Sequence, residues 1–267
     1  MRLILRTLGD VFPDVTVWHI ENDIALVARE RPIVRNLDRM EARFGLDPVR
    51  KFFFGIGIYD VFSLLSLQLA SEDGFRKLVD DGPLHVDDLP LLEYRAPRAQ
   101  FARSYAFFLT AFDERRRLAS SSLLITDWLH NRKVGNNEVI DFTLMQSLQR
   151  FSPDAFRFMF FDRVLADCKE PWTLARIVSN LEHTKREKES DRAMAALVAL
   201  DPSSPRTLML RAQVIMRKKG NDAAGKDPEM REILTQCVAG SGQQGRIFRD
   251  TCRQMGEMFS IALPAAK

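Results

Sequence analysis

The stretch "LRTLGDVFPDVTVWHIENDIALVARE" (Leu5–Glu30) predicts the fold of the N-terminal part of the chain. Its first residues carry apolar side chains at helical spacing, which indicates a helix that ends near Pro13. The segment "VTVWHI" (Val15–Ile20) is rich in β-branched and aromatic residues, as strands are. After the turn residues Asn22-Asp23, "IALVA" (Ile24–Ala28) is typical of a second short strand. We therefore expect a helix followed by a β-hairpin.

Two short helices are expected in the residues that follow. In the segment "NLDRMEARFG", Asn36 is a suitable N-terminal cap and Gly45 a suitable stop. A second helix is predicted in "SEDGFRKLVDDG" (Ser71–Gly82), where it ends at Gly82.

The apolar stretch "FFFGIGIYDVFSLLSLQLA" (Phe52–Ala70) is long enough to cross a bilayer, which takes about 20 residues. However, Asp60 lies at its middle, and a carboxylate is costly in lipid. Gly55 and Gly57 indicate a chain break, after which Asp60 can cap a new helix at Val61. We interpret the stretch as two short buried segments and expect no membrane span.

The chain changes character after Pro97, where strand patterns almost vanish. The segment "RAQFARSYAFFLTAFDERRRLASSSLL" (Arg98–Leu124) predicts a long amphipathic helix. Four later helices are predicted by a capping residue followed by proline, at Ser152-Pro153, Glu170-Pro171, Ser204-Pro205 and Asp227-Pro228. Gly220 and Gly240 are expected to end helices. Helices with short connections indicate a stacked array of helical hairpins.

A faint repeat accompanies these helices. Pro171 and Pro205 are 34 residues apart, which is the period of tetratricopeptide repeats. The fold class expected is therefore mainly α: an N-terminal α/β piece over residues 1–98, followed by a tetratricopeptide-like helical domain over residues 99–267.

The composition is that of an ordinary globular protein, with 46% apolar and 28% charged residues and a net charge of +3. Residues 1–100 hold 13 Lys+Arg against 16 Asp+Glu, and the remainder holds 26 against 20. The basic second half shows no dense basic run with interleaved aromatic residues. We interpret it as a solvated helix surface and expect no nucleic-acid partner.

The cysteines are Cys168, Cys237 and Cys252, with long spacings and no CxxC pair. This pattern argues against a disulfide framework and against a structural zinc site, so reduced thiols are expected. The start of the chain does not fit a signal peptide, since Arg6 interrupts its apolar run. A cytoplasmic location is therefore expected.

The segment "GPLHVDDLPLLEYRAPR" (Gly82–Arg98) is the strongest candidate for a site. Its His85, Asp87 and Asp88 have the chemistry of metal ligands or of an acid/base pair. No second His/Glu cluster accompanies them, however, because the other histidines lie in predicted strands or helices: His19, His130 and His183.

The same segment also fits a structural interpretation, which we favour. Asp87-Asp88 is good turn chemistry, and Pro90 pushes Leu89 into an extended conformation. Leu91–Tyr94 is then expected to be a short strand or an extended strap.

Elsewhere the chain lacks the motifs of common active sites. There is no P-loop, nucleophile elbow or HExxH pattern, and Gly55-x-Gly57 is not followed by the third glycine of a nucleotide loop. Nothing in the sequence activates Ser120–Ser122 as nucleophiles. Three tryptophans are expected to be core or interface residues, namely Trp18, Trp128 and Trp172. We expect no catalytic, cofactor-binding or metal-binding residue in this chain.

The order of elements over residues 1–98 resembles the C-terminal end of the catalytic domain of spermidine synthase-like proteins, the large bacterial fusion members of the polyamine aminopropyltransferase family. The resemblance rests on residues that stand at the places of the family pattern: Phe12-Pro13, Val17-Trp18, Pro83-Leu84, Asp87, Asp88, Pro90, Glu93 and Tyr94. Val86 replaces the threonine that is usual there, and His85 replaces a small polar residue.

The resemblance implies a class I methyltransferase-like (Rossmann-type) sheet, of which this chain holds the last helix and the final two strands. In the intact family the reaction is aminopropyl transfer from decarboxylated S-adenosylmethionine to putrescine. The family's cofactor loop and catalytic aspartate belong to earlier segments, and no residue here matches them. The chain alone is therefore expected to be inactive. Intact members are often anchored in a membrane through an N-terminal region, and they often continue into a helical tail.

The partners expected from these interpretations follow from the sheet and from the tail. Because a two-stranded hairpin alone is marginal in water, an N-terminal catalytic half or a second copy of the chain is expected to cover the sheet edge. The helical tail is expected to bind a protein. The alternative function is a non-enzymatic helical-repeat module for protein interaction.

Overall fold

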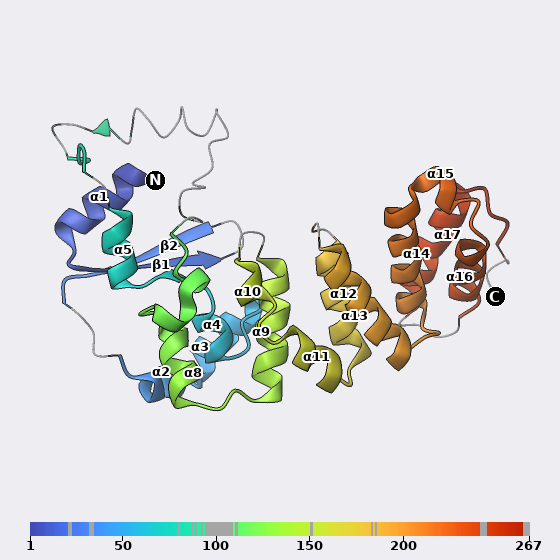
Figure 1. The fold of residues 1–267 in the computed structure, drawn as a ribbon, viewed down its shortest axis with the longest axis horizontal. Helices are drawn as coiled ribbons and strands as arrows, with labels where there is room; N and C mark the ends of the chain where they lie inside the picture. Colours follow the sequence, from blue (N-terminus) through green and yellow to red (C-terminus); the bar gives the residue numbers. More distant parts are fainter. Residues whose placement is uncertain are drawn as a thin grey trace. The chain divides into compact units, whose positions relative to one another are not determined.

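The structure is a computed structural model that describes most of the chain, namely residues 1–20, 23–31, 35–79, 81–86, 88, 90–91, 93, 109, 112–149, 152–182, 184, 186–240 and 245–263. The chain forms two compact units, unit 1 (Met1–Phe160) and unit 2 (Phe161–Lys267) (Figure 1). The described residues are mainly helical and include one three-stranded antiparallel sheet. This confirms the coarser expectation of a mainly helical chain with strands in its N-terminal part.

The N-terminal helix and hairpin of unit 1 form as expected. Helix α1 (Arg2–Val11) ends before Pro13, and strands β1 (Asp14–Ile20) and β2 (Asp23–Arg29) pair antiparallel along their whole length. A third short strand, β3 (Gln68–Ala70), pairs with the other edge of β1, so the sheet order is β2-β1-β3.

The two faces of the hairpin differ in what covers them. Val15 and Val17 are buried with Leu5 of α1 and with Phe75 of α5 (Glu72–Leu78), and this forms one core of unit 1. Side chains alternate between the faces of a strand, so Trp18 and its neighbours lie on the opposite face. That second face forms the floor of the pocket described below.

The helical part of unit 1 surrounds an aromatic core in which Phe62, Trp128 and Phe142 are buried. Its elements are α2 (Leu37–Phe44), α3 (Asp47–Gly55), α4 (Val61–Leu65), the 3₁₀ helix η1 (Glu114–Ser120), α8 (Leu124–Asn131), α9 (Asn136–Leu148) and α10 (Asp154–Arg157). Both α8 and α9 pack against α4.

The caps predicted at Asn36 and Asp60 are confirmed, since their side chains accept hydrogen bonds from backbone amides in the first turns of α2 and α4. Ser71 caps α5 in the same way, although the sequence did not predict it. Helix α2 ends before Gly45 as expected, whereas α5 ends at Leu78, before the predicted Gly82.

The apolar stretch Phe52–Ala70 breaks where predicted, since α3 ends at Gly55 and Gly57 has a positive φ of 78°. The second segment is buried, but the first is not: Phe52 in α3 is 65% exposed and Ile56 is 50% exposed. The expectation of two buried segments is therefore wrong for the first. Among the described residues, no helix combines the length and the apolar character that crossing a membrane requires.

The long helix predicted over Arg98–Leu124 is wrong from Phe112 onward. Asp113 caps the 3₁₀ helix η1, and the chain is extended again at Ser121 before α8 begins. The physical reason is a buried ion pair: Arg115 donates to both carboxylate oxygens of Asp113, at 2.8 and 2.6 Å, and both side chains are fully buried. The preceding residues 94–108, 110 and 111 lie outside the described part of the chain.

The boundary between the units lies after Phe160, whereas the sequence placed a boundary after Arg98. Residues beyond 98 complete the core of unit 1. The Glu114 carboxylate accepts a hydrogen bond from the backbone amide of Ser71 (2.7 Å), and Arg115 donates to the carbonyl of Ser66 (3.2 Å). The family assignment of residues 1–98 remains a prediction, but these residues do not form a compact unit by themselves.

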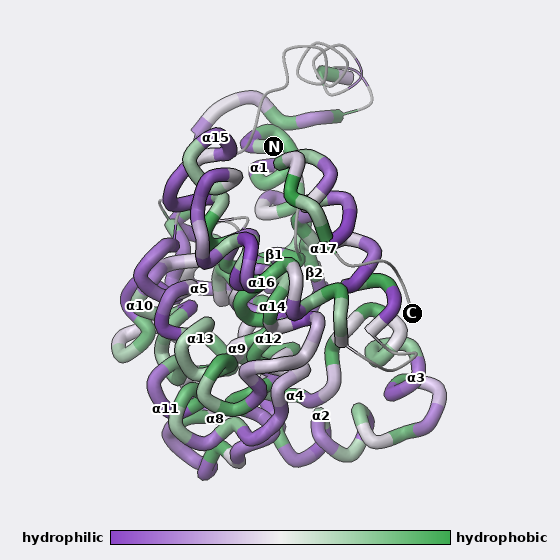
Figure 2. The backbone as a smooth tube through the Cα atoms, turned by 90° about the vertical axis from the view of Figure 1, so that its right-hand side faces the viewer, coloured by the Kyte–Doolittle hydropathy of each residue, from purple (hydrophilic) through white to green (hydrophobic). Residues whose placement is uncertain are grey.

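Unit 2 consists of helices that pack on their neighbours in sequence. They are α11 (Phe161–Asp167), α12 (Pro171–Glu182), α13 (Glu187–Leu200), α14 (Pro205–Lys219), α15 (Asn221–Ala224), α16 (Pro228–Ala239) and α17 (Arg246–Met258). Helix α12 packs along α13, and α14 packs along α16 and α17. These helices carry both hydrophobic and hydrophilic residues, as helices with one buried face do (Figure 2).

Three of the four predicted proline starts lie in unit 2, and they are confirmed at Pro171, Pro205 and Pro228. Gly220 and Gly240 follow the ends of α14 and α16 as predicted. The fourth start, at Ser152-Pro153, yields only the four-residue α10. There the Ser152 hydroxyl donates to the Gln146 side chain (2.7 Å) and does not cap the helix.

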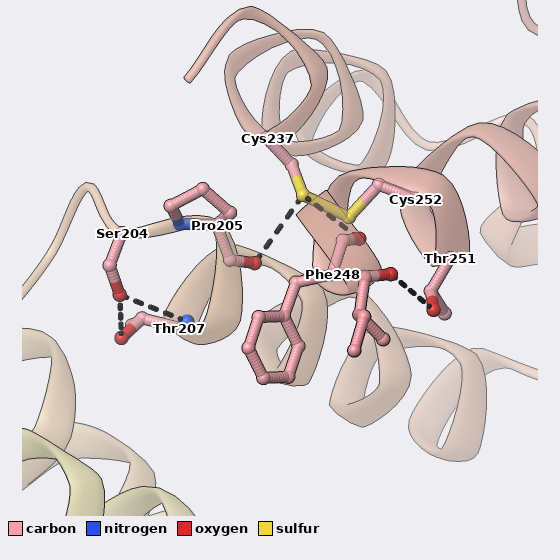
Figure 3. The surroundings of a disulfide bond; sticks show 8 residues. Ser204, Pro205, Thr207, Cys237, Phe248, Thr251 and Cys252 are labelled. Atoms are coloured by element: carbon pink, nitrogen blue, oxygen red, sulfur yellow. Dashed lines mark hydrogen bonds between the residues drawn. A yellow bond between two sulfur atoms is a disulfide. The ribbon is translucent and has the colours of Figure 1, made fainter. Parts of the chain in front are cut away.

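The expectation of reduced thiols is wrong for two of the three cysteines. Cys237 of α16 and Cys252 of α17 form a disulfide, with their Cα atoms 6.4 Å apart (Figure 3). Cys168 is free and buried. The pair forms because α16 and α17 pack against each other in one core. The two cysteines are 15 residues apart with no local motif between them, so this pairing could not be predicted from the sequence.

Candidate functional site

The segment Gly82–Arg98 does not assemble a site among its described residues. The backbone amide of His85 donates to the hydroxyl of Thr7 (2.9 Å), which ties the segment to α1. Asp88 lies in a turn, as predicted, and is exposed. Asp87 and Tyr94 lie outside the described residues.

The expected strand or strap at Leu91–Tyr94 is wrong where the structure describes it. Leu91 and Glu93 have helical conformation, and the amide of Glu93 donates to the carbonyl of Pro90 (3.2 Å). Proline suits the first position of a helical turn, since its missing N–H is not needed there. Pro90 therefore begins a turn of helix.

The described histidines do not gather with acidic or thiol side chains into a metal-binding cluster, and no group of three or more such ligands occurs in the described ranges. His19 of β1 is buried, and its pKa is lowered by burial and by the nearby cation of Arg115. His130 lies in α8, and His183 is outside the described residues.

One acidic group has a strongly shifted pKa. Burial raises the pKa of Asp60 to about 7, although the amide and hydroxyl of Ser63 donate to its carboxylate at 2.6 and 2.9 Å. Its role in the structure is to cap α4.

Unit 1 holds a cavity of about 440 Å³ between the second face of the hairpin and α2, which we call the arginine pocket. Its lining residues are Thr16, Trp18, Val27, Arg29, Arg35, Asn36, Arg39, Met40, Arg43, Glu72 and Leu124. Four arginines and a single acid make this lining cationic. Trp18, Val27, Met40 and Leu124 make its walls apolar.

Two of the four arginines are held in place by acidic partners. Glu72 bridges them, with one carboxylate oxygen 3.1 Å from Arg29 and the other 2.7 Å from Arg35. Arg29 also pairs with Asp14 (2.7 Å), and Arg35 pairs with Asp127 (3.4 Å). These contacts neutralise much of both charges.

The other two arginines lie one turn apart on α2. Arg39 and Arg43 are exposed, and their guanidinium groups make no ion pair or hydrogen bond with any described residue. Residues four apart on a helix share one face, so both groups are directed to the same side of the pocket. Their charges are available to a ligand.

The charge of the arginine pocket bears on the family resemblance. Decarboxylated S-adenosylmethionine carries a sulfonium and an ammonium group, and putrescine is a dication. A lining with an excess of arginine repels both. The pocket is therefore not suited to the substrates that the resemblance implies.

Sequence reasoning missed this pocket because its residues come from five separate segments. The one local signal is the spacing of four between Arg39 and Arg43, which places two cations along one side of the helix predicted after Asn36. The partners on β1, β2 and α5 become neighbours only through the fold.

Comparison with known proteins adds no family to this geometry: no protein-family model, curated protein or solved structure matches the chain.

Proposed function

We propose that this chain is the C-terminal part of a spermidine synthase-like aminopropyltransferase, inactive alone, whose cofactor-binding half is supplied by another segment or chain. The observation that supports this proposal is the order of α1, β1 and β2, together with the open edge of β2. β1 is paired on both sides, whereas β2 has no strand partner on its outer edge among the described residues. An edge strand of seven residues is a template for a further strand.

The backbone register identifies which groups of β2 face outward. The amide of His19 donates to Leu67 on the β3 side (2.8 Å), so its N–H points away from β2. Hydrogen-bonded and non-bonded pairs alternate in an antiparallel ladder. Since His19 lies opposite Ile24, the amides of Ile24, Leu26 and Ala28 point to the open edge.

Two substitutions on β2 test the open edge. Ala28→Pro removes an outward amide and is expected to abolish concentration-dependent association, measured by light scattering, without lowering the melting temperature. Ala25→Pro removes an amide that faces β1, so it is expected to destabilise unit 1. A wild-type chain that stays monomeric at high concentration would argue against association through the exposed edge of β2.

Activity measurements test the family assignment directly. The purified chain is incubated with decarboxylated S-adenosylmethionine and putrescine, and spermidine is quantified by chromatography. We expect no spermidine and no binding of the aminopropyl donor in calorimetry, because the sequence holds no glycine-rich cofactor loop. Robust transfer by the chain alone would refute the proposal.

The proposed location is the cytoplasm, which keeps most thiols reduced. The disulfide between Cys237 and Cys252 weighs against this location, and rapid alkylation in intact cells tests it: recovery of the pair mainly as thiols would support the cytoplasm. Recovery of the pair mainly as the disulfide would place the protein in an oxidising compartment and contradict the proposal.

The second candidate function is a tetratricopeptide-like module for protein interaction, and the helical pairing in unit 2 favours it. Helices α12 and α13 form one packed pair, and α14 packs along α16, with starts at Pro171 and Pro205. A pull-down that compares the full chain with residues 161–267 tests this. If unit 2 captures none of the proteins that the full chain captures, this function is wrong.

A further inference from the structure

We propose that the arginine pocket binds a planar organic anion, an aromatic ring system that carries a phosphate or a carboxylate group. This inference does not depend on the proposed function, because it rests on a different feature of unit 1. The pocket combines two chemistries within one cavity of about 440 Å³, a size suited to a small organic molecule.

The cationic side of the pocket recognises the anionic group. Arg39 and Arg43 have no acidic partner among the described residues, and they lie one helical turn apart. A guanidinium group presents paired N–H donors that match carboxylate or phosphate oxygens. Two such groups on one helix face can hold one anion from two sides.

The acidic residue of the pocket does not cancel this charge. Both oxygens of Glu72 are engaged, one by Arg29 at 3.1 Å and the other by Arg35 at 2.7 Å. The bridge leaves Arg39 and Arg43 as the uncompensated charges of the lining. It also holds Arg29 and Arg35 as fixed parts of the wall.

The apolar side of the pocket recognises the body of the ligand. Trp18 is held in one orientation, since its Nε1–H donates to the Thr16 hydroxyl (2.9 Å). Val27, 45% exposed, lies on the same face of the hairpin, because it pairs directly with Thr16. Met40 lies opposite on α2, at the position after Arg39. A flat ring between these side chains buries apolar surface that is otherwise in contact with water.

Calorimetry with four probes on the full chain tests both halves of the recognition. The probes are naphthyl phosphate, naphthoate, inorganic phosphate and the neutral naphthalene methanol. We expect naphthyl phosphate, naphthoate or both to bind at least about tenfold more tightly than inorganic phosphate and than naphthalene methanol. The stronger of the two naphthyl anions identifies the charged group as phosphate or carboxylate. Added salt is expected to weaken the binding.

Variants connect the binding to the pocket. The double substitution Arg39→Gln and Arg43→Gln should weaken binding of the naphthyl anion at least about tenfold, since each removes a charge-assisted hydrogen bond. Arg50→Gln is the matched control, because Arg50 is an exposed arginine of unit 1 that does not line the pocket. Val27→Trp keeps every arginine but fills the floor, so it should also reduce binding. Circular dichroism and melting temperature verify that each variant is folded.

Failure of both naphthyl anions to bind the folded wild-type chain would overturn the proposal. Equal affinity of the wild type and of the folded Arg39/Arg43 double variant for the naphthyl anion would also overturn it. Binding of naphthalene methanol as tight as that of the anions would show that charge plays no part, and inorganic phosphate binding as tightly as naphthyl phosphate would exclude the apolar half.

Discussion

Reduction of the Cys237–Cys252 disulfide is expected to loosen unit 2 and to leave unit 1 unchanged. The bond joins α16 to α17 across a separation of 15 residues, and both cysteines are fully buried. A cross-link restricts the unfolded chain, so its loss favours unfolding of the region that it closes. Unit 1 holds no part of this loop.

The expected size of the effect follows from the loop length. Closing a loop of about 15 residues stabilises the folded state by about 3 kcal/mol. Since 1.4 kcal/mol corresponds to a tenfold change in an equilibrium constant, the amides of α16 and α17 should lose a factor of about 150 in protection from hydrogen exchange. Reduction keeps both sulfur atoms in place, so it measures the cross-link without a new cavity.

Hydrogen exchange followed by mass spectrometry measures each unit separately in the full chain. Reductant should lower protection in α16 and α17, while α4 and α9 of unit 1 serve as the internal control. The variant with Cys237→Ala and Cys252→Ala should show the lower protection already, and reductant should change it no further. The reasoning fails if protection in α16 and α17 stays within about twofold of its oxidised value, or if unit 1 loses as much as unit 2.

Three further predictions concern single side chains. Burial raises the pKa of Asp60 to about 7, so the folded wild type favours the protonated acid. The free energy of unfolding of the wild type therefore falls as the pH rises from about 4 to about 7. Asp60→Asn keeps a cap for α4 but carries no charge. A pKa shift from 3.8 to about 7 corresponds to about 4 kcal/mol. Thermal melts should therefore show the variant to be more stable than the wild type at a pH of about 8, and the two to be equally stable near pH 4. Equal melting temperatures of the two proteins at both pH values would contradict this. Arg115→Met leaves the buried carboxylate of Asp113 unpaired and should cost about 3–5 kcal/mol in urea unfolding; adding Asp113→Leu should recover part of the loss, and no recovery would argue against the ion pair as the cause. Trp172→Ala removes the ring that lies 3.8 Å from the guanidinium carbon of Arg206 and should cost about 1 kcal/mol, whereas Trp172→Phe should cost less; equal melting temperatures for all three proteins would show that the stack contributes nothing.

Local chemistry explains which parts of the fold could be predicted from the sequence. Caps such as Asn36 and Ser204 act within three residues, and the prolines at Pro205 and Pro228 mark helix starts by their own geometry. The β-branched and aromatic residues of Val15–Ile20 indicate a strand by their own conformational preference. These signals depend on a few adjacent residues, and the structure confirms them.

The predictions that were wrong depend on contacts between distant residues. The segment around Arg115 has helical spacing, but the buried guanidinium group of Arg115 pairs with Asp113 and also donates to the carbonyl of Ser66, 49 residues earlier. These contacts together hold a 3₁₀ turn instead of a long helix. Cys237 and Cys252 form a disulfide because α16 packs against α17, and no local sequence motif predicts this pairing. Phe52 is apolar, yet it is largely exposed on α3.

The candidate site shows the same division. The sequence identified the acidic segment around Asp88 because its residues adjoin one another, but the described part of that segment gathers no ligands. The arginine pocket needs Trp18 of β1 beside Arg39 of α2 and near Glu72 of α5. Only the tertiary structure brings such positions together.

The bond between Glu114 and Ser71 has a consequence for the order in which the chain folds during synthesis. Helix α4 emerges from the ribosome long before the residues that complete its core, since Phe142 and Phe156 follow Phe62 by 80 and 94 positions. The apolar side chains of this core, such as Phe62, therefore stay exposed until α10 has been synthesised. The helices of unit 2 contact sequence neighbours and can pair as each one appears. We therefore expect unit 2 to fold faster than unit 1, whose core joins residues that lie far apart in the sequence.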